Sequence, residues 1–132
     1  HAPMYELSEG IHVHRVPVAW GSDFFHWVAN MNESMGSHGA KLILEEGPFD
    51  LIHAHDWLVG DAAIALKHNF KIPLIATIHA TEHGRYNGIY TEEQSYINGK
   101  EHLLAYNAWR IIVCTDYMRR EVERALASPW GK

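Results

Sequence analysis

The chain has 132 residues, of which 47% are hydrophobic and 20% are charged, and its formal net charge is -5. This composition is typical of one globular domain, and the negative charge argues against a basic surface for nucleic acid or membranes. The single cysteine, Cys114, excludes an intrachain disulfide, and no apolar run approaches the ~20 residues that span a bilayer. The opening segment HAPMYELSEG lacks an apolar signal core. We therefore expect a cytoplasmic protein without a membrane span or a nucleic-acid partner.

The first elements in chain order are a short strand and a long helix. Residues 11–18 alternate between apolar and polar side chains, which predicts a strand with Pro17 at its edge or end. Residues 22–46 have helical spacing, and a serine or aspartate at their start can cap the helix. Gly36 and Gly39 weaken the middle of this segment and favour a break into two pieces.

The rest of the chain alternates apolar, β-branched runs with segments of helical spacing. The predicted strands cover residues 49–55, 71–80 and 110–115, and the predicted helices cover residues 57–70, 91–109 and 116–127. Residues 81–88 contain two glycines and are predicted to form a loop. This alternation predicts an α/β fold, a Rossmann-like parallel sheet with helices on both faces. Cys114, at a strand end, is expected to be a small buried residue.

Polar residues follow three of the predicted strands, at the point where each strand ends. They are Asp56 and Trp57, residues 79–84, and residues 114–116. Ligands of open parallel sheets bind beyond the carboxyl ends of the strands, so these residues are expected along one binding edge. His53 and His55 are two positions apart on a strand and therefore point to the same face.

Two interpretations of these residues follow from their types alone. His53, His55, Asp56, His79 and His83 have the donor types of a hydrolytic zinc or di-metal site, which would make the protein a metal-dependent hydrolase. Their spacing, however, matches neither the zincin helix motif nor an H-x-H-x-D-H pattern. In the second interpretation the histidines bond to backbone carbonyls and Asp56 caps the following helix.

The order of these residues resembles a known family. The segment carries D-x-x-H-x-H-D-W as Asp50, His53, His55, Asp56 and Trp57, and P-x-x-x-T-x-H as Pro73, Thr77 and His79. A later strand ends in Thr115, where serine is common. The stretch from Phe49 to Leu126 resembles the N-terminal domain of glycogen-synthase-like, retaining glycosyltransferases of the GT-B fold, in the group 1 glycosyltransferase superfamily.

The resemblance implies an enzyme that moves a sugar from a nucleotide-sugar to a saccharide or another hydroxyl acceptor, with retention of anomeric configuration. This chain would supply the acceptor side of the cleft. His79 matches the family histidine that contacts the transferred sugar and is the catalytic candidate. Asp56 and Trp57 match residues that line the sugar pocket, and His55 and Arg85 complete the expected substrate-binding set. The resemblance implies no metal and no cofactor, because the nucleotide-sugar is a co-substrate.

The chain also departs from the family pattern. Ala80 follows His79 where glycogen synthases often have asparagine, which argues against a glucan acceptor and a glucose donor. The family's first strand and its C-terminal donor domain have no counterpart in the sequence. We therefore expect residues 1–132 to be one Rossmann-like domain from a two-domain enzyme, inactive alone and prone to self-association through an unpaired strand edge. A non-catalytic saccharide-binding module is the remaining alternative.

Overall fold

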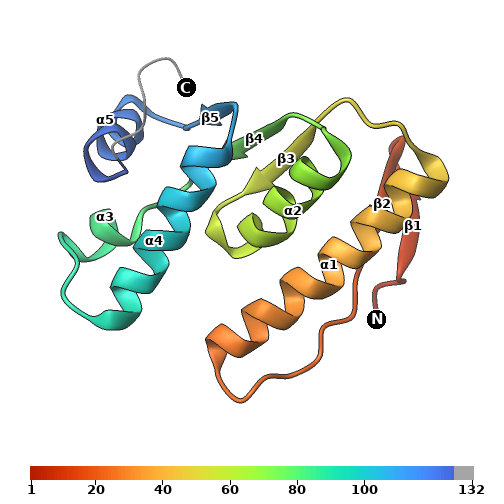
Figure 1. Ribbon diagram of the computed structural model, residues 1–132, viewed down its shortest axis with the longest axis horizontal. Coiled ribbons are helices and arrows are strands. Elements are labelled where there is room, and N and C mark those ends of the chain that lie inside the picture. Colours follow the sequence, from red (N-terminus) through yellow and green to blue (C-terminus); the bar gives the residue numbers. More distant parts are fainter. Residues whose placement is uncertain (127–132) are drawn as a thin grey trace.

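The computed structural model describes residues 1–126 of the chain (Figure 1). The strands are β1 (Tyr5–Ser8), β2 (Ile11–His14), β3 (Ile52–His55), β4 (Leu74–Thr77) and β5 (Arg110–Ile112). The helices are α1 (Phe24–Glu46), α2 (Gly60–Phe70), α3 (Glu82–Tyr86), α4 (Glu92–Asn107) and α5 (Asp116–Ala125), and the 3₁₀ turn η1 (Trp57–Val59) precedes α2. The predicted end of the last helix at residue 127 lies outside the described residues. A search of the described helices finds none with the length and hydropathy needed to cross a membrane.

The central sheet is parallel, with the strand order β3-β4-β5. Ala54, Ala76 and Ile111 stand in register on the three strands, so their side chains share one face. Apolar residues of α2, α4 and α5 pack against this face and form the core with it. The predicted fold class is confirmed: the domain is α/β, with a Rossmann-like parallel sheet flanked by helices.

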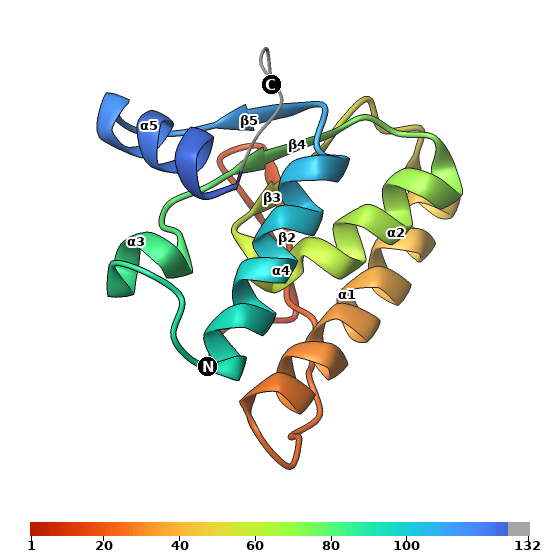
Figure 2. The same cartoon turned by 60° about the vertical axis from the view of Figure 1, so that its left-hand side comes forward.

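The opposite face of the sheet carries the histidines of β3. His53 and His55, together with Arg110 and Ile112 of β5, point to this face and are exposed. We expected helices on both faces, whereas the helices of the described core pack on the face of Ala54, and Figure 2 shows α2 and α4 on the same side of the strands. Within residues 1–126 His53 and His55 are therefore exposed on this face, whereas Thr77 of the central strand, on the same face, is buried.

Helix α1 is continuous, although its two glycines favoured a break. It packs along α2 (Figure 1), and a Cβ atom built on Gly39 would lie 2.8 Å from Cδ1 of Leu66 in α2. A Cβ on Gly36 would lie 3.9 Å from Cβ of Ala62. The glycine at position 39 thus allows the two helices to approach closely, and this packing offsets the low helix propensity of glycine.

The N-terminal segment also differs from the prediction. The strand expected over residues 11–18 is shorter and pairs antiparallel with β1, so this hairpin is not part of the parallel sheet. Glu9 and Gly10 form its two-residue turn with φ angles of 50° and 80°, the left-handed geometry that matches the twist of a tight hairpin. The hairpin lies beside α1, where His14 Nδ1 is 3.1 Å from His38 Nε2.

The predicted loop after β4 contains the short helix α3. Its N-cap is Thr81, whose hydroxyl oxygen accepts a hydrogen bond from the Gly84 N–H at 2.9 Å. Asn87 ends the helix in a left-handed conformation with φ 54°. These two residues explain why a segment with two glycines still forms one helical turn.

Candidate functional site

The carboxyl ends of β3 and β4 are joined by Asp56. Its backbone N–H donates to the Thr77 carbonyl at 2.9 Å, and its carboxylate Oδ1 accepts from the His79 N–H at 2.8 Å. The backbone of Asp56 has φ 60° and ψ 177°, a combination that residues other than glycine rarely adopt. Asp56 occupies the N-cap position of η1, as one interpretation of the sequence has it, but its side chain makes no capping bond there. The residue instead fixes the position of His79 relative to β3.

We call the bond from the His79 N–H to the Asp56 carboxylate the clamp. Three histidine side chains, those of His53, His55 and His79, lie in a row beside it. Nδ1 of His55 is 3.2 Å from Nε2 of His79, and the ring centroids of His53 and His55 are 4.2 Å apart. His53 Nε2 bonds to the Thr77 hydroxyl at 2.7 Å, which replaces the expected bond to a backbone carbonyl. A hydrogen bond between two imidazoles needs one N–H and one lone pair, so only one of the facing nitrogens of His55 and His79 carries a proton. Desolvation, and then the nearby His55 and His79, lower the pKa of His53.

Trp57 begins η1 directly after the clamp and is half-buried. Its ring meets the ring of Phe24, at the start of α1, edge to face with 6.2 Å between centroids. An edge-to-face pair of this kind is favourable for aromatic rings. The predicted site therefore extends from the sheet edge toward the N-terminal end of α1.

Arg85 lies apart from the histidine row. It is in α3, and its Nη1 donates to Oε2 of Glu82 at 3.0 Å. Glu82 is buried, whereas the Arg85 side chain is 53% exposed. The structure thus brings His55, Asp56 and His79 together, places Trp57 next to them, and pairs Arg85 with a glutamate of its own helix.

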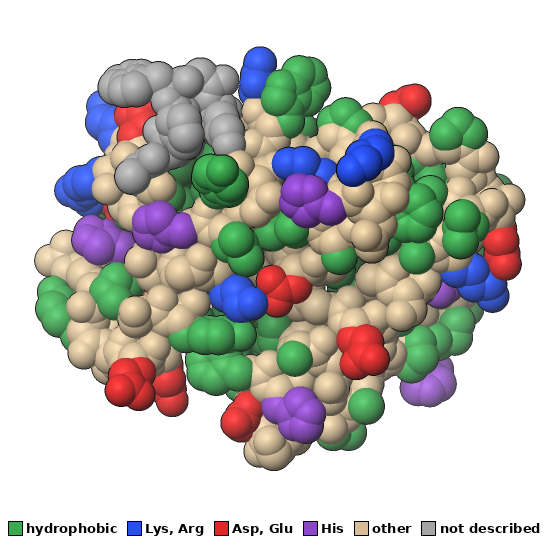
Figure 3. All heavy atoms as spheres, in the orientation of Figure 1, with side chains coloured by type: hydrophobic (Ala, Val, Ile, Leu, Met, Phe, Trp, Pro, Cys, Tyr) green, Lys and Arg blue, Asp and Glu red, His purple; other side chains and the backbone are tan. Residues whose placement is uncertain are grey.

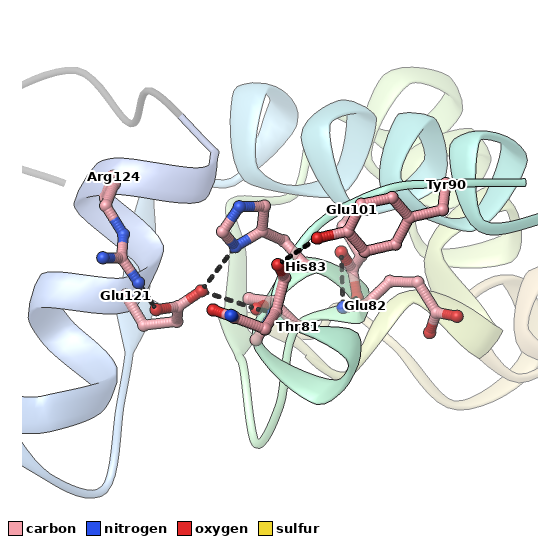
Figure 4. A network of polar contacts seen from close by, with 9 residues as sticks. Thr81, Glu82, His83, Tyr90, Glu101, Glu121 and Arg124 are labelled. Carbon is pink, nitrogen blue, oxygen red and sulfur yellow. Dashed lines mark hydrogen bonds and ion pairs between the residues drawn. The ribbon is translucent and has the colours of Figure 1, made fainter.

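Two buried glutamates support α3, the helix that follows His79 (Figure 4). The Glu101 carboxylate, on α4, accepts the backbone N–H of Glu82 at 2.9 and 3.2 Å. The pKa of Glu101 is raised to about 7, chiefly by burial and also by the nearby Glu82 and Asp56 carboxylates, which together outweigh the lowering effects of the Glu82 N–H and of Arg85. The helix is therefore held by a carboxyl group that titrates near neutral pH.

Glu121 of α5 holds the other side of the same helix. Its Oε1 lies 3.3 Å from the Thr81 hydroxyl and 3.1 Å from His83 Nδ1, and Arg124 pairs with its Oε2 (Figure 4). Burial acts to raise the pKa of Glu121, but the bonds from His83 and Arg124 outweigh it, so the pKa is lowered. The pKa values of the two buried glutamates are therefore shifted in opposite directions, so their charges have opposite effects on the stability of the fold.

The comparison with known proteins shows the family of the chain. Residues 2–132 match the family model described as Glycosyltransferase Family 4. The chain belongs to this glycosyltransferase family. It is 33% identical over 131 residues to an uncharacterized glycosyltransferase of Methanocaldococcus jannaschii, an alignment that covers 98% of the chain and 33% of that protein. It is 31% identical over 132 residues to the glycogen synthase of Mycobacterium tuberculosis, which covers 92% of the chain and 32% of that protein.

A third similar protein shows the same partial coverage. An uncharacterized glycosyltransferase of Bacillus subtilis is 34% identical over 102 residues, covering 77% of the chain and 28% of that protein. The chain therefore spans about a third of the length of the relatives it matches.

The residues that follow β5 in this glycosyltransferase chain, 114–116, lead into α5 and cap it. Thr115 caps that helix, with its hydroxyl oxygen accepting the Met118 N–H at 3.1 Å. Cys114 is exposed, so the prediction that it is buried is wrong. β5 ends at Ile112, so Cys114 lies in the bend between the strand and α5, where its side chain is exposed.

Metal binding finds no support in the described part of the glycosyltransferase chain. Residues 1–126 contain no group of three or more His, Cys, Asp or Glu side chains positioned to share a metal ion. The histidine row bonds ring to ring and ring to hydroxyl, and the Asp56 carboxylate bonds to a backbone N–H. The metal-dependent hydrolase alternative therefore lacks the convergent ligands that it requires.

Three supporting residues were missed by sequence reasoning. Asn32 of α1 is buried, donates to the Leu58 carbonyl at 2.7 Å and accepts the Ala62 N–H at 2.9 Å, so it fixes the turn that carries Trp57. Glu101 and Glu121 are the other two. A signal for Glu101 was present, because position 101 falls on the apolar helix face of Leu104.

Proposed function

We propose that this chain is the acceptor-side domain of a retaining glycosyltransferase, which transfers a sugar from a nucleotide-sugar to a saccharide or another hydroxyl acceptor. The observation that carries the proposal is the bond from His79 N–H to the Asp56 carboxylate at 2.8 Å. It fixes an exposed imidazole at the carboxyl edge of a parallel sheet, where such sheets bind their ligands. Family membership supplies the reaction class.

His79 would orient the transferred sugar. Its ring is exposed, and its Nε2 faces His55, which sets the direction of the imidazole plane. Catalysis by positioning requires that the reacting group stays within a narrow range of orientations. The clamp on the His79 backbone and the contact with the His55 ring supply two independent restraints on that orientation.

Asp56 and Trp57 would bind the sugar directly. Oδ1 of Asp56 is used by the His79 N–H, and within residues 1–126 no hydrogen bond to its Oδ2 occurs, so this oxygen can accept a sugar hydroxyl. The half-buried indole ring of Trp57 offers an apolar face and one N–H donor. Arg85 could reach a phosphate or an acceptor only after leaving Glu82, which makes it the weakest member of the proposed set.

The charge on the leaving nucleotide must be stabilised as the bond breaks. We assign this part to a donor-binding domain outside residues 1–132, in keeping with relatives about three times as long. In the two-domain arrangement that we propose, the reaction takes place in the cleft between the domains. The nucleotide-sugar is a co-substrate, and the proposal requires neither a cofactor nor a metal.

The test is nucleotide release from a panel of UDP-, ADP- and GDP-sugars by the full-length protein that contains this chain. We expect release with one donor class, and His79→Ala should lower turnover by orders of magnitude while the circular dichroism spectrum is kept. Asp56→Asn is the milder companion, because the amide oxygen still accepts the His79 N–H but the charge is lost. Turnover near the wild-type rate in His79→Ala, or no release with any donor from a folded protein, would refute the proposal. The second result would leave a saccharide-binding module.

A further inference from the structure

A hollow of about 450 Å³ lies between the N-terminal ends of α1 and α4 and the helix α3. Its volume is within the usual range for ligand sites. In Figure 3 the molecule is indented at this edge, at the lower left, where acidic and hydrophobic side chains meet. Phe24 lines the hollow and also touches the ring of Trp57, so the hollow continues from the site proposed for the sugar.

The lining combines aromatic rings with carboxylates. Phe24 and Tyr86 are 51% and 53% exposed, so their rings are accessible from the hollow. Asp23, Glu82 and Glu93 bring carboxylate oxygens to the same lining. Aromatic faces pack against the C–H faces of a sugar ring, and carboxylates accept strong hydrogen bonds from hydroxyl groups. The combination suits a polyhydroxylated ring.

The charge of the lining disfavours anionic ligands, because its carboxylates are acidic and the nearby Arg85 guanidinium is paired with Glu82. Within the described residues that line the hollow, none is a lysine or arginine. Two helices begin here, but Asp23 accepts the His26 N–H at 2.8 Å, and Thr91 and Gln94 form a complete capping box on α4. The helix termini are thus capped within the chain, and their N–H groups do not form an open anion site.

We propose that this hollow is an acceptor subsite that takes an uncharged sugar ring and rejects phosphorylated or carboxylated acceptors. The inference rests on the proposed function, since it names the acceptor class of the same cleft. Tyr86 and Phe24 would hold the faces of the ring, and Glu93 and Glu82 would accept its hydroxyls. Glu82 is already fixed by Arg85 and by the bond from its own N–H to Glu101, so it needs no reordering on binding.

The first test measures binding to the full-length protein by saturation-transfer NMR. The probes are neutral oligosaccharides of glucose, mannose and galactose, with glucose 6-phosphate as the anionic probe. We expect a neutral probe to bind and Glu93→Gln to weaken it about fivefold or more. Glu92→Gln is the matched control, because Glu92 shares the first turn of α4 but does not line the hollow.

The binding results distinguish a sugar subsite in the hollow from a hollow that binds no sugar. Equal binding by Glu93→Gln, Glu92→Gln and wild-type protein, tighter binding of glucose 6-phosphate, or no binding of any neutral probe would overturn the subsite. Loss on Glu93→Gln and on Tyr86→Ala, with Glu92→Gln unchanged, would establish it.

A second test distinguishes failure of the subsite from failure of the proposed function. Donor hydrolysis by wild-type protein without acceptor reports the transferase alone. Where hydrolysis occurs, a higher acceptor KM in Glu93→Gln than in Glu92→Gln supports the subsite, and equal KM values overturn it. Where no donor is hydrolysed, the proposed function fails, and the NMR comparison still decides whether the hollow binds sugar.

Discussion

Glu101 should destabilise the fold when it is ionised. It is 2% exposed, and burial raises its pKa from about 4.5 to about 7, a difference of 2.5 pH units. At about 1.36 kcal/mol per unit, the folded state is disfavoured by about 3 kcal/mol once the carboxyl group has lost its proton. The proton is bound more tightly in the folded state, so stability falls as the pH rises from about 4.5 to about 7 and stays low above it.

Glu101→Gln removes this penalty and keeps the shape of the side chain. The amide oxygen can still accept the Glu82 N–H, which lies 2.9 Å from Oε1 in the native protein. We expect the variant to match wild-type stability near pH 4 and to exceed it by up to about 3 kcal/mol near pH 8. Urea unfolding at several pH values, followed by circular dichroism, measures the difference.

Glu121→Gln is the matched control, and we expect it to change the stability in the opposite direction from Glu101→Gln. The pKa of Glu121 is lowered, so its charge stabilises the fold above the unfolded pKa of about 4.5 and this contribution is lost in acid. The Glu121→Gln substitution removes this charge and should therefore destabilise the protein near neutral pH. A Glu101→Gln protein that is less stable than wild type near pH 8, or a difference that does not change with pH, would refute the reasoning for Glu101.

Three other predictions concern the framework of the site. Gly36→Ala should stabilise α1 by about 0.5 to 1 kcal/mol, whereas Gly39→Ala should gain less because Leu66 must move; equal thermal midpoints would contradict the packing seen between α1 and α2. Asn32→Ala should cost about 1 to 3 kcal/mol in urea unfolding, since it leaves the buried Ala62 N–H without its partner. The isolated chain should self-associate through the free edge of β3, which within residues 1–126 pairs with β4 alone; a monomer in light scattering at high concentration would contradict this.

The sheet and its binding edge could be predicted from the sequence because each depends on local signals. Short apolar runs between glycine, proline and polar residues mark β3, β4 and β5. Parallel strands end on the same side, so Asp56 and His79 were expected together, and the 2.8 Å bond shows that they meet. The capping box at Thr91 and Gln94 was equally readable, since it needs residues only three positions apart.

Features that depend on distant contacts could not be predicted in this way. The continuity of α1 depends on how Gly39 meets Leu66, and the exposure of Cys114 depends on how the chain turns between β5 and α5. The role of Asp56 as a clamp required a backbone conformation that is rare outside glycine, which residue type does not reveal. The burial of Glu101 depends on how α4 packs against α3, whose Glu82 N–H it accepts, and residue type alone does not reveal that contact.

The segment from His79 to Glu82 is fixed by two features that are both unfavourable for stability. Asp56 holds its first N–H from a strained backbone, and Glu101 holds the N–H of Glu82 with a carboxylate that is costly above pH 7. The charge of Asp56 also raises the pKa of Glu101, so the two restraints oppose each other energetically. A fold optimised for stability alone would avoid both. Their coincidence around one exposed histidine supports the role proposed for His79, because functional sites commonly keep positioning at the expense of stability.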